Sequence, residues 1–230
     1  LEDGSSLISA LAGDAISPVL LGTWIVMAIL VAFGFMARRS LAGAADATIP
    51  EDRVSLRSVS EALVSWLDGF VHGVLEDDSY RDLVPFFGTI FMFVLFANFF
   101  GLIPGMEPPT GDSDLTFGLG VVAFTFYIVQ GFRTKGLAYF RSFLGPLLPL
   151  APLMLPIDLA DNLIRPFSLG VRLYANMFAD HTVLSIFTGL TYLIVPLAFY
   201  ALGSIFCIIQ AMIFMVLSIS YVRLAAGHDH

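Results

Sequence analysis

The sequence predicts an all-α membrane protein with about five transmembrane helices and one amphipathic helix at the membrane surface. The chain is 57% hydrophobic and only 13% charged, whereas soluble domains carry about 25% charged residues. Several stretches of roughly 17–20 residues contain no charge, which is the length that a helix needs to cross about 30 Å of hydrocarbon. Basic residues gather in some of the connecting segments and are absent from others.

The first crossing is expected over residues 17–38. Pro18 begins an apolar run that ends at the basic pair Arg38 and Arg39, and a linker rich in Gly and Ala follows. The opening segment Leu1–Ser5 has no initiator Met and carries acidic residues, so we expect the natural start to be processed or to lie upstream.

Residues 55–76 differ from this first run because charged and apolar residues alternate at helical spacing. Arg57 and Glu61 stand between apolar residues such as Trp66 and Phe70, so that one face of the helix is apolar. This pattern favours a helix that lies at the membrane surface.

Two further crossings are predicted over residues 83–104 and 115–132. The first of them ends at Pro104 and Gly105, and an acidic loop leads into the second.

The last part of the chain stays apolar from Pro146 to Tyr221, about 75 residues, which is too long for one crossing. We expect a turn near Thr188 and Gly189. Two long helices, over residues 147–188 and 192–224, would then form an antiparallel hairpin in a single membrane domain.

The basic residues predict the orientation of the chain. If the crossings alternate, one side of the membrane holds all of the following: Arg38, Arg39, Arg53, Arg57, Arg133, Lys135, Arg141 and Arg223. Basic loops stay inside the cell, so the amino terminus is expected outside and the carboxy terminus inside.

Composition also argues against several classes of function. The single cysteine, Cys207, lies in an apolar run, which excludes a disulfide framework or a cysteine metal cluster within one chain. The chain has no basic stripe suited to nucleic acid and no phosphate-binding loop for a nucleotide. We therefore expect no cofactor, no bound metal and no nucleic-acid partner.

Six ionisable side chains, leaving aside the thiol and the phenols, interrupt the long apolar region between residues 142 and 222. They are Asp158, Asp161, Arg165, Arg172, Asp180 and His181. A charge at the centre of a bilayer costs roughly 2.5–3.5 kcal/mol, so a cluster inside a membrane helix indicates a functional site.

Helical geometry arranges most of this cluster in one stripe. At about 100° per residue, four polar side chains fall within about 60° of arc: Asp161, Arg165, Arg172 and Asn176. Asp158 lies about 40° from Arg172, and the stripe extends about 27 Å from Asp158 to Asn176. It is nearly as long as the hydrocarbon is thick.

Each polar residue also has a structural interpretation. Asp161 and Arg165 have the spacing of an ion pair near the inner headgroups, and Arg165 is interpreted as an anchor. His181 points to the other side of its helix and could be an interfacial residue. Gln210 could form a hydrogen bond between helices. Arg172 lies too deep to reach the headgroups past bulky apolar neighbours, so a functional role is favoured there.

Three segments resemble subunit a of F-type ATP synthases. The most specific is Pro166–His181, with the sequence PFSLGVRLYANMFADH. Residues 210–217, QAMIFMVL, and residues 98–104, NFFGLIP, are similar to other parts of the family's pattern. The resemblance covers most of the chain from about residue 52 onward.

This resemblance implies a non-catalytic membrane subunit of an enzyme complex, whose last two helices form a long tilted hairpin against a rotating ring of c subunits. The implied partners are the c-ring, the peripheral-stalk b subunits, the F1 sector indirectly and the lipid bilayer, with protons, or alternatively sodium, as the transported ion. The implied location is a bacterial plasma membrane, with the mitochondrial inner membrane as the alternative.

The resemblance also implies roles for individual residues. Arg172 would face the ion-binding carboxylate of the ring, favour its ionised form and block direct proton leakage. Asn176, His181 and Gln210 would lie along the access path from the outer side, and Asp158 along the path to the inner side. Asp161 and Asp180 are further candidates for the proton pathway.

Two positions depart from the family's pattern. The family often has a His or Glu where this chain has Gly203, as the partner of the residue at His181. Asp180 stands where the family usually has Gly, so either its carboxylate or water could replace the missing group.

Two other classes of function stay open at this point. A stand-alone transporter or channel could use a buried Arg to bind an anionic substrate, although the chain has no internal repeat. A purely structural membrane anchor would leave the six ionisable residues without a role.

Overall fold

The computed structural model describes residues 17–42, 55–75, 81–103, 106–136, 151–190 and 194–226. Within these ranges the chain forms long α-helices, includes the short 3-10 helix Pro109–Gly111, and has no strand. The predicted all-α membrane class is confirmed. The chain divides into two compact units, Leu1–Pro109 and Thr110–His230.

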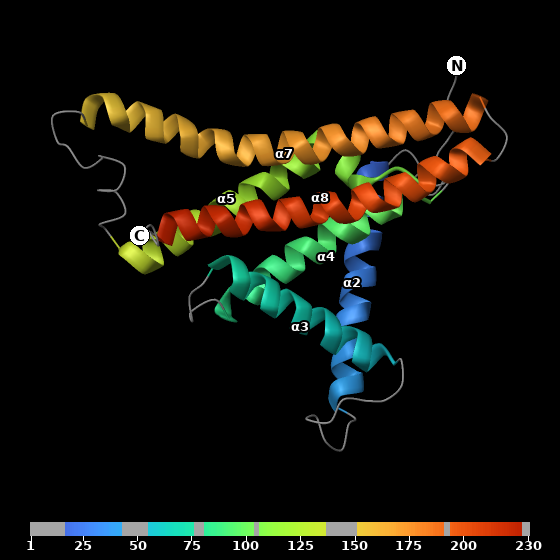
Figure 1. Ribbon diagram of the computed structural model, residues 1–230, viewed down its shortest axis with the longest axis horizontal. Helices are drawn as coiled ribbons and strands as arrows, with labels where there is room; N and C mark the ends of the chain where they lie inside the picture. The colour runs from blue at the N-terminus through green and yellow to red at the C-terminus, as the bar shows by residue number, and fades with distance from the viewer. Residues whose placement is uncertain are drawn as a thin grey trace. The chain divides into compact units, whose positions relative to one another are not determined.

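The first unit contains α2 (Pro18–Ala42), α3 (Leu56–Leu75) and α4 (Val84–Gly101), and each of the three helices contacts the other two. In Figure 1 these helices are coloured from blue to green. Helix α2 continues past the basic pair that marks the expected end of the crossing, since neither Gly nor Pro stands at that point.

Helix α3 packs on α4 through aromatic side chains. The Trp66 ring lies 5.6 Å from that of Phe70 and 5.5 Å from that of Phe91 on α4, measured between centroids. Its first turns carry an ion pair, with Arg57 Nε 2.7 Å from Glu61 Oε1. The helix is therefore amphipathic, as the sequence indicates. Its position at the membrane surface stays a prediction.

The second unit contains α5 (Ser113–Lys135), α7 (Ala151–Leu190) and α8 (Ile194–Ala226). Helix α5 begins two residues before the predicted start. The reason is an N-cap, because Asp112 Oδ1 accepts hydrogen bonds from the backbone amides of Asp114 (2.9 Å) and Leu115 (3.3 Å).

The backbones of α5 and α7 lie very close together where the two helices cross, because each has a glycine there. A Cβ atom added at Gly120 would lie only 2.5 Å from the carbonyl oxygen of Pro166, and one added at Gly170 would lie 3.1 Å from the carbonyl oxygen of Thr116. A hydrogen bond from the Tyr127 hydroxyl to the Asn162 side chain ties the same two helices together. The position of α7 along α5 is thereby fixed.

Helices α7 and α8 form the long hairpin and lie alongside each other in Figure 1. Helix α7 continues through Thr188 and Gly189 to Leu190, and α8 begins at Ile194, so the turn expected near Thr188 and Gly189 does not interrupt α7. The physical reason is that a single helical glycine costs only about 1 kcal/mol, which does not end a helix of this length.

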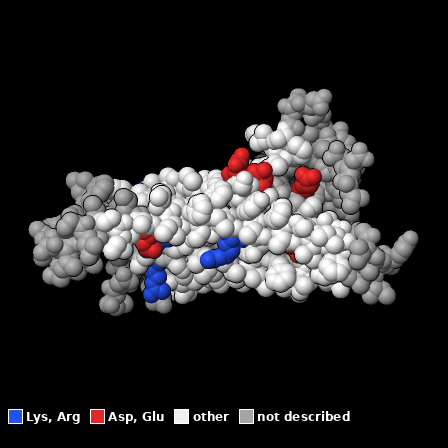
Figure 2. All heavy atoms as spheres, turned by 90° about the horizontal axis from the view of Figure 1, so that it is seen from above, with Lys and Arg blue, Asp and Glu red and all other residues white. Residues whose placement is uncertain are grey.

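Among the described residues, four helical stretches are long and apolar enough to cross a membrane: Pro18–Ser40, Val84–Gly101, Ser113–Lys135 and Leu197–Ala225. Of the described residues on the face drawn in Figure 2, few are charged, as expected for a protein solvated by lipid. Helix α7 is not among these stretches, because its charged residues lower its hydropathy, and its crossing stays a prediction. The orientation of the chain also stays a prediction. Two of the basic residues that support it, Arg53 and Arg141, lie outside the described ranges.

Candidate functional site

The first half of α7 carries an ion pair. Asp161 accepts a hydrogen bond from the guanidinium of Arg165, the i, i+4 contact that the spacing predicts. The guanidinium carbon of Arg165 also lies 5.5 Å from the ring centroid of Tyr221 on α8. These two contacts tie Arg165 to its own helix and to α8. Its place as an anchor near the inner headgroups stays a prediction.

Asp158 lies in the helical part of α7, one turn before Asn162. Its side chain is outside the described part of the structure, so its predicted place on a path to the inner side stays a prediction.

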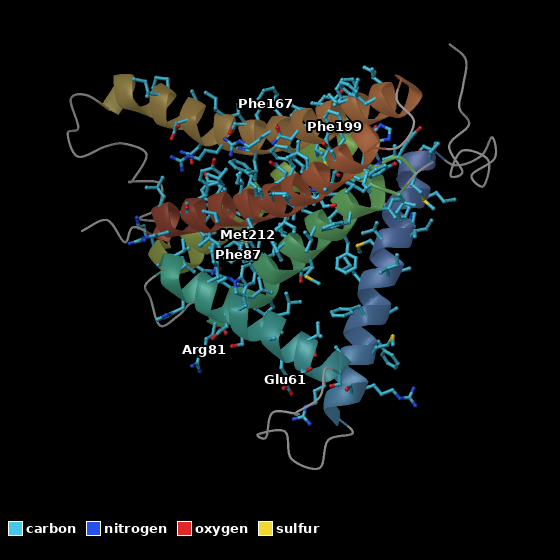
Figure 3. All side chains as sticks on the ribbon, turned by 45° about the vertical axis from the view of Figure 1, so that its right-hand side comes forward. Glu61, Arg81, Phe87, Phe167, Phe199 and Met212 are labelled. Carbon is cyan, nitrogen blue, oxygen red and sulfur yellow. The ribbon has the colours of Figure 1, made fainter. Side chains whose placement is uncertain are left out.

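Arg172 occupies the middle of α7 and is exposed. A stripe of buried residues at helical spacing, Leu169, Leu173 and Met177, forms the packed face of the helix. Arg172 stands outside this stripe, and within the described ranges its guanidinium forms no ion pair or hydrogen bond. The exposed surface of this part of α7 is otherwise mainly apolar, as at Phe167, which Figure 3 labels. The charge is therefore available to a group on another molecule.

One turn further along, Asn176 joins α7 to α8. Its side-chain nitrogen donates a hydrogen bond to Gln210 Oε1 at 2.7 Å, and Gln210 is only 3% exposed. This is the interhelical hydrogen bond that was one interpretation of Gln210. It holds an amide pair one helical turn from Arg172.

Asn176 and Gln210 also line a pocket of about 400 Å³ between α7 and α8. Asp180 contributes the only carboxylate among the residues that line it, and the other lining side chains are apolar: Ala179, Val183, Phe199, Leu202, Phe206, Ile209 and Ile213. Phe199, labelled in Figure 3, lies near the amino-terminal end of α8. His181 is not one of the lining residues, in keeping with its different direction around α7.

The structure adds contacts that the sequence did not predict. The rings of Phe187 and Phe199 stack with centroids 4.5 Å apart and join α7 to α8 beside the pocket. Asn162 is a polar residue next to Asp161 in an otherwise apolar stretch, and this is the sequence signal that indicates a bond to another helix, here to Tyr127. Within the described ranges, no three His, Cys, Asp or Glu side chains lie together so as to hold a metal ion.

Comparison with known proteins identifies the family. The sequence model described as ATP synthase A chain matches residues 20–223. A relative from Bdellovibrio bacteriovorus, named ATP synthase subunit a, is 43% identical over 87% of this chain and 87% of its own length. A protein of the same name from Solibacter usitatus is 42% identical over 70% of this chain and 71% of its own length. Another, from Nitratidesulfovibrio vulgaris, is 34% identical over 90% of this chain and 85% of its own length. This chain therefore belongs to the ATP synthase A chain family.

Proposed function

We propose that this chain is the ion-conducting stator subunit of the membrane sector, F0, of an ATP synthase. The names of its relatives support a role in that sector and a partnership with the c-ring, and the apolar helices support an integral membrane location. The chain is then a non-catalytic part of an enzyme, with ATP formed elsewhere in the complex.

The observation that carries this proposal is the exposed guanidinium of Arg172, which has no ion-pair partner within the described residues. Leaving such a charge in lipid is costly, so a partner of opposite charge is expected. A carboxylate on a neighbouring ring subunit fulfils that need. At about 4 Å and an effective dielectric of about 20, the two charges attract by about 4 kcal/mol before desolvation costs.

This attraction gives Arg172 its function in our proposal. A ring carboxylate must be protonated while it travels through lipid, and it must release its proton where it meets the stator. Arg172 favours the ionised form at that point. Because arginine keeps its own proton at any relevant pH, it also prevents protons from passing directly between the two access paths. Proton flow is thereby coupled to rotation of the ring.

The two access paths are offset along the hairpin. Asn176, Gln210 and His181 are assigned to the path from the outer side, supported by the Asn176–Gln210 bond at the edge of the pocket. Asp158 is assigned to the path to the inner side, with Asp161 near it. We place the chain in a bacterial plasma membrane, with its amino terminus outside, which the bacterial relatives and the basic loops support.

Purification of a tagged form of this chain from its native membrane tests the assignment to F0. The chain is expected to copurify with c-ring and peripheral-stalk b proteins, and vesicles that contain the complex are expected to pump protons on addition of ATP. A chain that transports ions or anionic solutes alone, without ring proteins, would instead favour a stand-alone transporter.

Cysteine accessibility tests the two offset paths in a background in which Cys207 is replaced by Ala. Cys at position 210 or 181 is expected to react with a membrane-impermeant reagent added from the outer side, because water reaches both positions from there. Cys at position 158 is expected to react from the inner side. Labelling of all three positions from the same side would refute the offset arrangement.

A further inference from the structure

Helix α7 contains Pro166 near its middle. Proline has no backbone N–H, so the carbonyl oxygen of Asn162 receives no helical hydrogen bond from residue 166, and the proline ring crowds that carbonyl. A proline inside a helix is a common cause of a bend. In Figures 1 and 3, α7 is bowed rather than straight, and Phe167, which Figure 3 labels, lies at the middle of the bow. The helix therefore has a bend point between its first turns and Arg172.

Helix α5 contacts α7 on both sides of this bend. Before the bend, the hydroxyl of Tyr127 donates a hydrogen bond to Oδ1 of Asn162. Beyond it, the ring centroids of Phe117 and Phe167 lie 5.2 Å apart, and a Cβ atom added at Gly170 would lie 3.2 Å from Cα of Phe117. Both arms of the bent helix are thus attached to α5.

Tyr127 is suited to control the angle of the bend. Its side chain is only 1% exposed, so its hydroxyl is removed from water and depends on a protein partner. Apolar packing tolerates small shifts, whereas a hydrogen bond requires a defined distance and direction. The partner, Asn162, lies one turn before Pro166, at the carbonyl that the proline leaves without its helical donor. The bond therefore stabilises the turn in which the hydrogen bonding of α7 is interrupted.

The angle of the bend decides where Arg172 lies. Arg172 is six residues beyond Pro166, about 9 Å along the helix axis, so a change of about 15° in the bend would move it sideways by about 2 Å. An opposite charge favours the ionised carboxylate when it lies within about 4–6 Å. A shift of this size would use up most of that range.

We propose that Tyr127 is a positioning residue for Arg172: its bond to Asn162 holds the bend of α7 at the angle that brings the guanidinium to the ring carboxylate. The inference rests on the proposed function. Tyr127 acts through α7 and takes no part in proton transfer itself.

The test compares Tyr127→Phe with the parent complex in vesicles of matched subunit content. The variant keeps the ring and loses only the hydroxyl. It is expected to assemble normally, while ATP synthesis per complex falls at least roughly threefold, because a displacement of about 1 Å can already impair a reacting group. Tyr174→Phe removes a hydroxyl from α7 itself, where the ring stacks on Phe178 with centroids 5.7 Å apart. It is the matched control and is expected to synthesise ATP normally.

A crosslink measures the position of α7 directly. In a background with Cys207→Ala, Ala175→Cys is introduced at an exposed position about one turn beyond Arg172, and a second Cys is placed beside the ring carboxylate. Tyr127→Phe is expected to lower the disulfide yield per assembled complex at least roughly threefold. A merely structural role would lower the amount of complex and leave this yield unchanged.

Asn162→Leu removes the same bond from the other helix. Each single variant and the double variant with Tyr127→Phe are expected to be equally impaired, because all of them lose one shared bond. Normal synthesis and crosslinking by either single variant would overturn the inference, and so would losses that multiply in the double variant. Failure of both single variants to assemble would also overturn it, since the bond would then serve stability.

The parent complex separates this inference from the proposed function. If the parent forms the crosslink and Arg172→Ala abolishes synthesis while Tyr127→Phe is normal, only the inference fails. A parent that forms no crosslink with the ring would contradict the proposed function itself.

Discussion

Replacing Arg172 with Ala is expected to abolish coupled ATP synthesis while the subunit stays inserted and assembled. The side chain is exposed and lies outside the packed stripe of α7, so its loss leaves no cavity in the described structure. The change removes the attraction that favours the ionised ring carboxylate, and it also removes the barrier between the two paths. Synthesis should stop, and the passive proton leak should rise.

Two further variants separate this role from charge alone. Arg172→Lys is also expected to lose most activity, since an ammonium can lose its proton when desolvated and lacks the planar guanidinium. Arg165→Ala should retain much of its activity, because Arg165 is held by Asp161 and Tyr221 as an anchor. ATP synthesis and leak are measured in vesicles with matched subunit content. Normal synthesis by an assembled Arg172→Ala complex would show that the guanidinium does not control the ring.

Replacing Gly120 with Val is expected to prevent assembly of the subunit. The nearest obstacle to a Cβ at this position is the backbone carbonyl oxygen of Pro166, 2.5 Å away, which cannot turn aside as a flexible side chain can. Helices α5 and α7 would have to separate, and overpacking of this kind costs about 1–3 kcal/mol or more. Their register, and with it the position of Arg172, would change.

Gly118→Val provides the control on the same helix, because no atom lies within 4 Å of a Cβ added at Gly118. The amounts of subunit in the membrane and of intact complex on a native gel are compared. We expect little complex with Gly120→Val and near-normal amounts with Gly118→Val. Equal assembly of the two variants would mean that the close crossing of α5 and α7 is not needed.

The helices could be predicted from the sequence because a membrane helix is defined by local properties, namely length and lack of charge. Their ends were less certain, since ends depend on particular atoms. Helix α5 begins where Asp112 caps it, and α7 passes through Gly189 because one glycine costs a helix too little to end it. The Asp161–Arg165 pair was predictable for the same reason, since both partners lie on one turn of one helix.

Contacts between helices could not be derived in this way. Helix α8 is apolar on most of its surface, so periodicity does not indicate which side faces α7. The bond from Asn176 to Gln210 and the contact of Asp180 with Gly203 join residues far apart in the sequence. The sequence offered only the open choice between Asp180 and water at Gly203.

A structure of the assembled complex with its c-ring tests the central claim most directly, through the distance from the Arg172 guanidinium to the nearest ring carboxylate. We predict that at least one ring carboxylate comes within about 4–6 Å, the range in which an opposite charge favours ionisation. An Arg172 side chain that faces lipid, or that stays more than about 10 Å from every ring carboxylate, would contradict the claim, because the attraction is then too weak to control a proton.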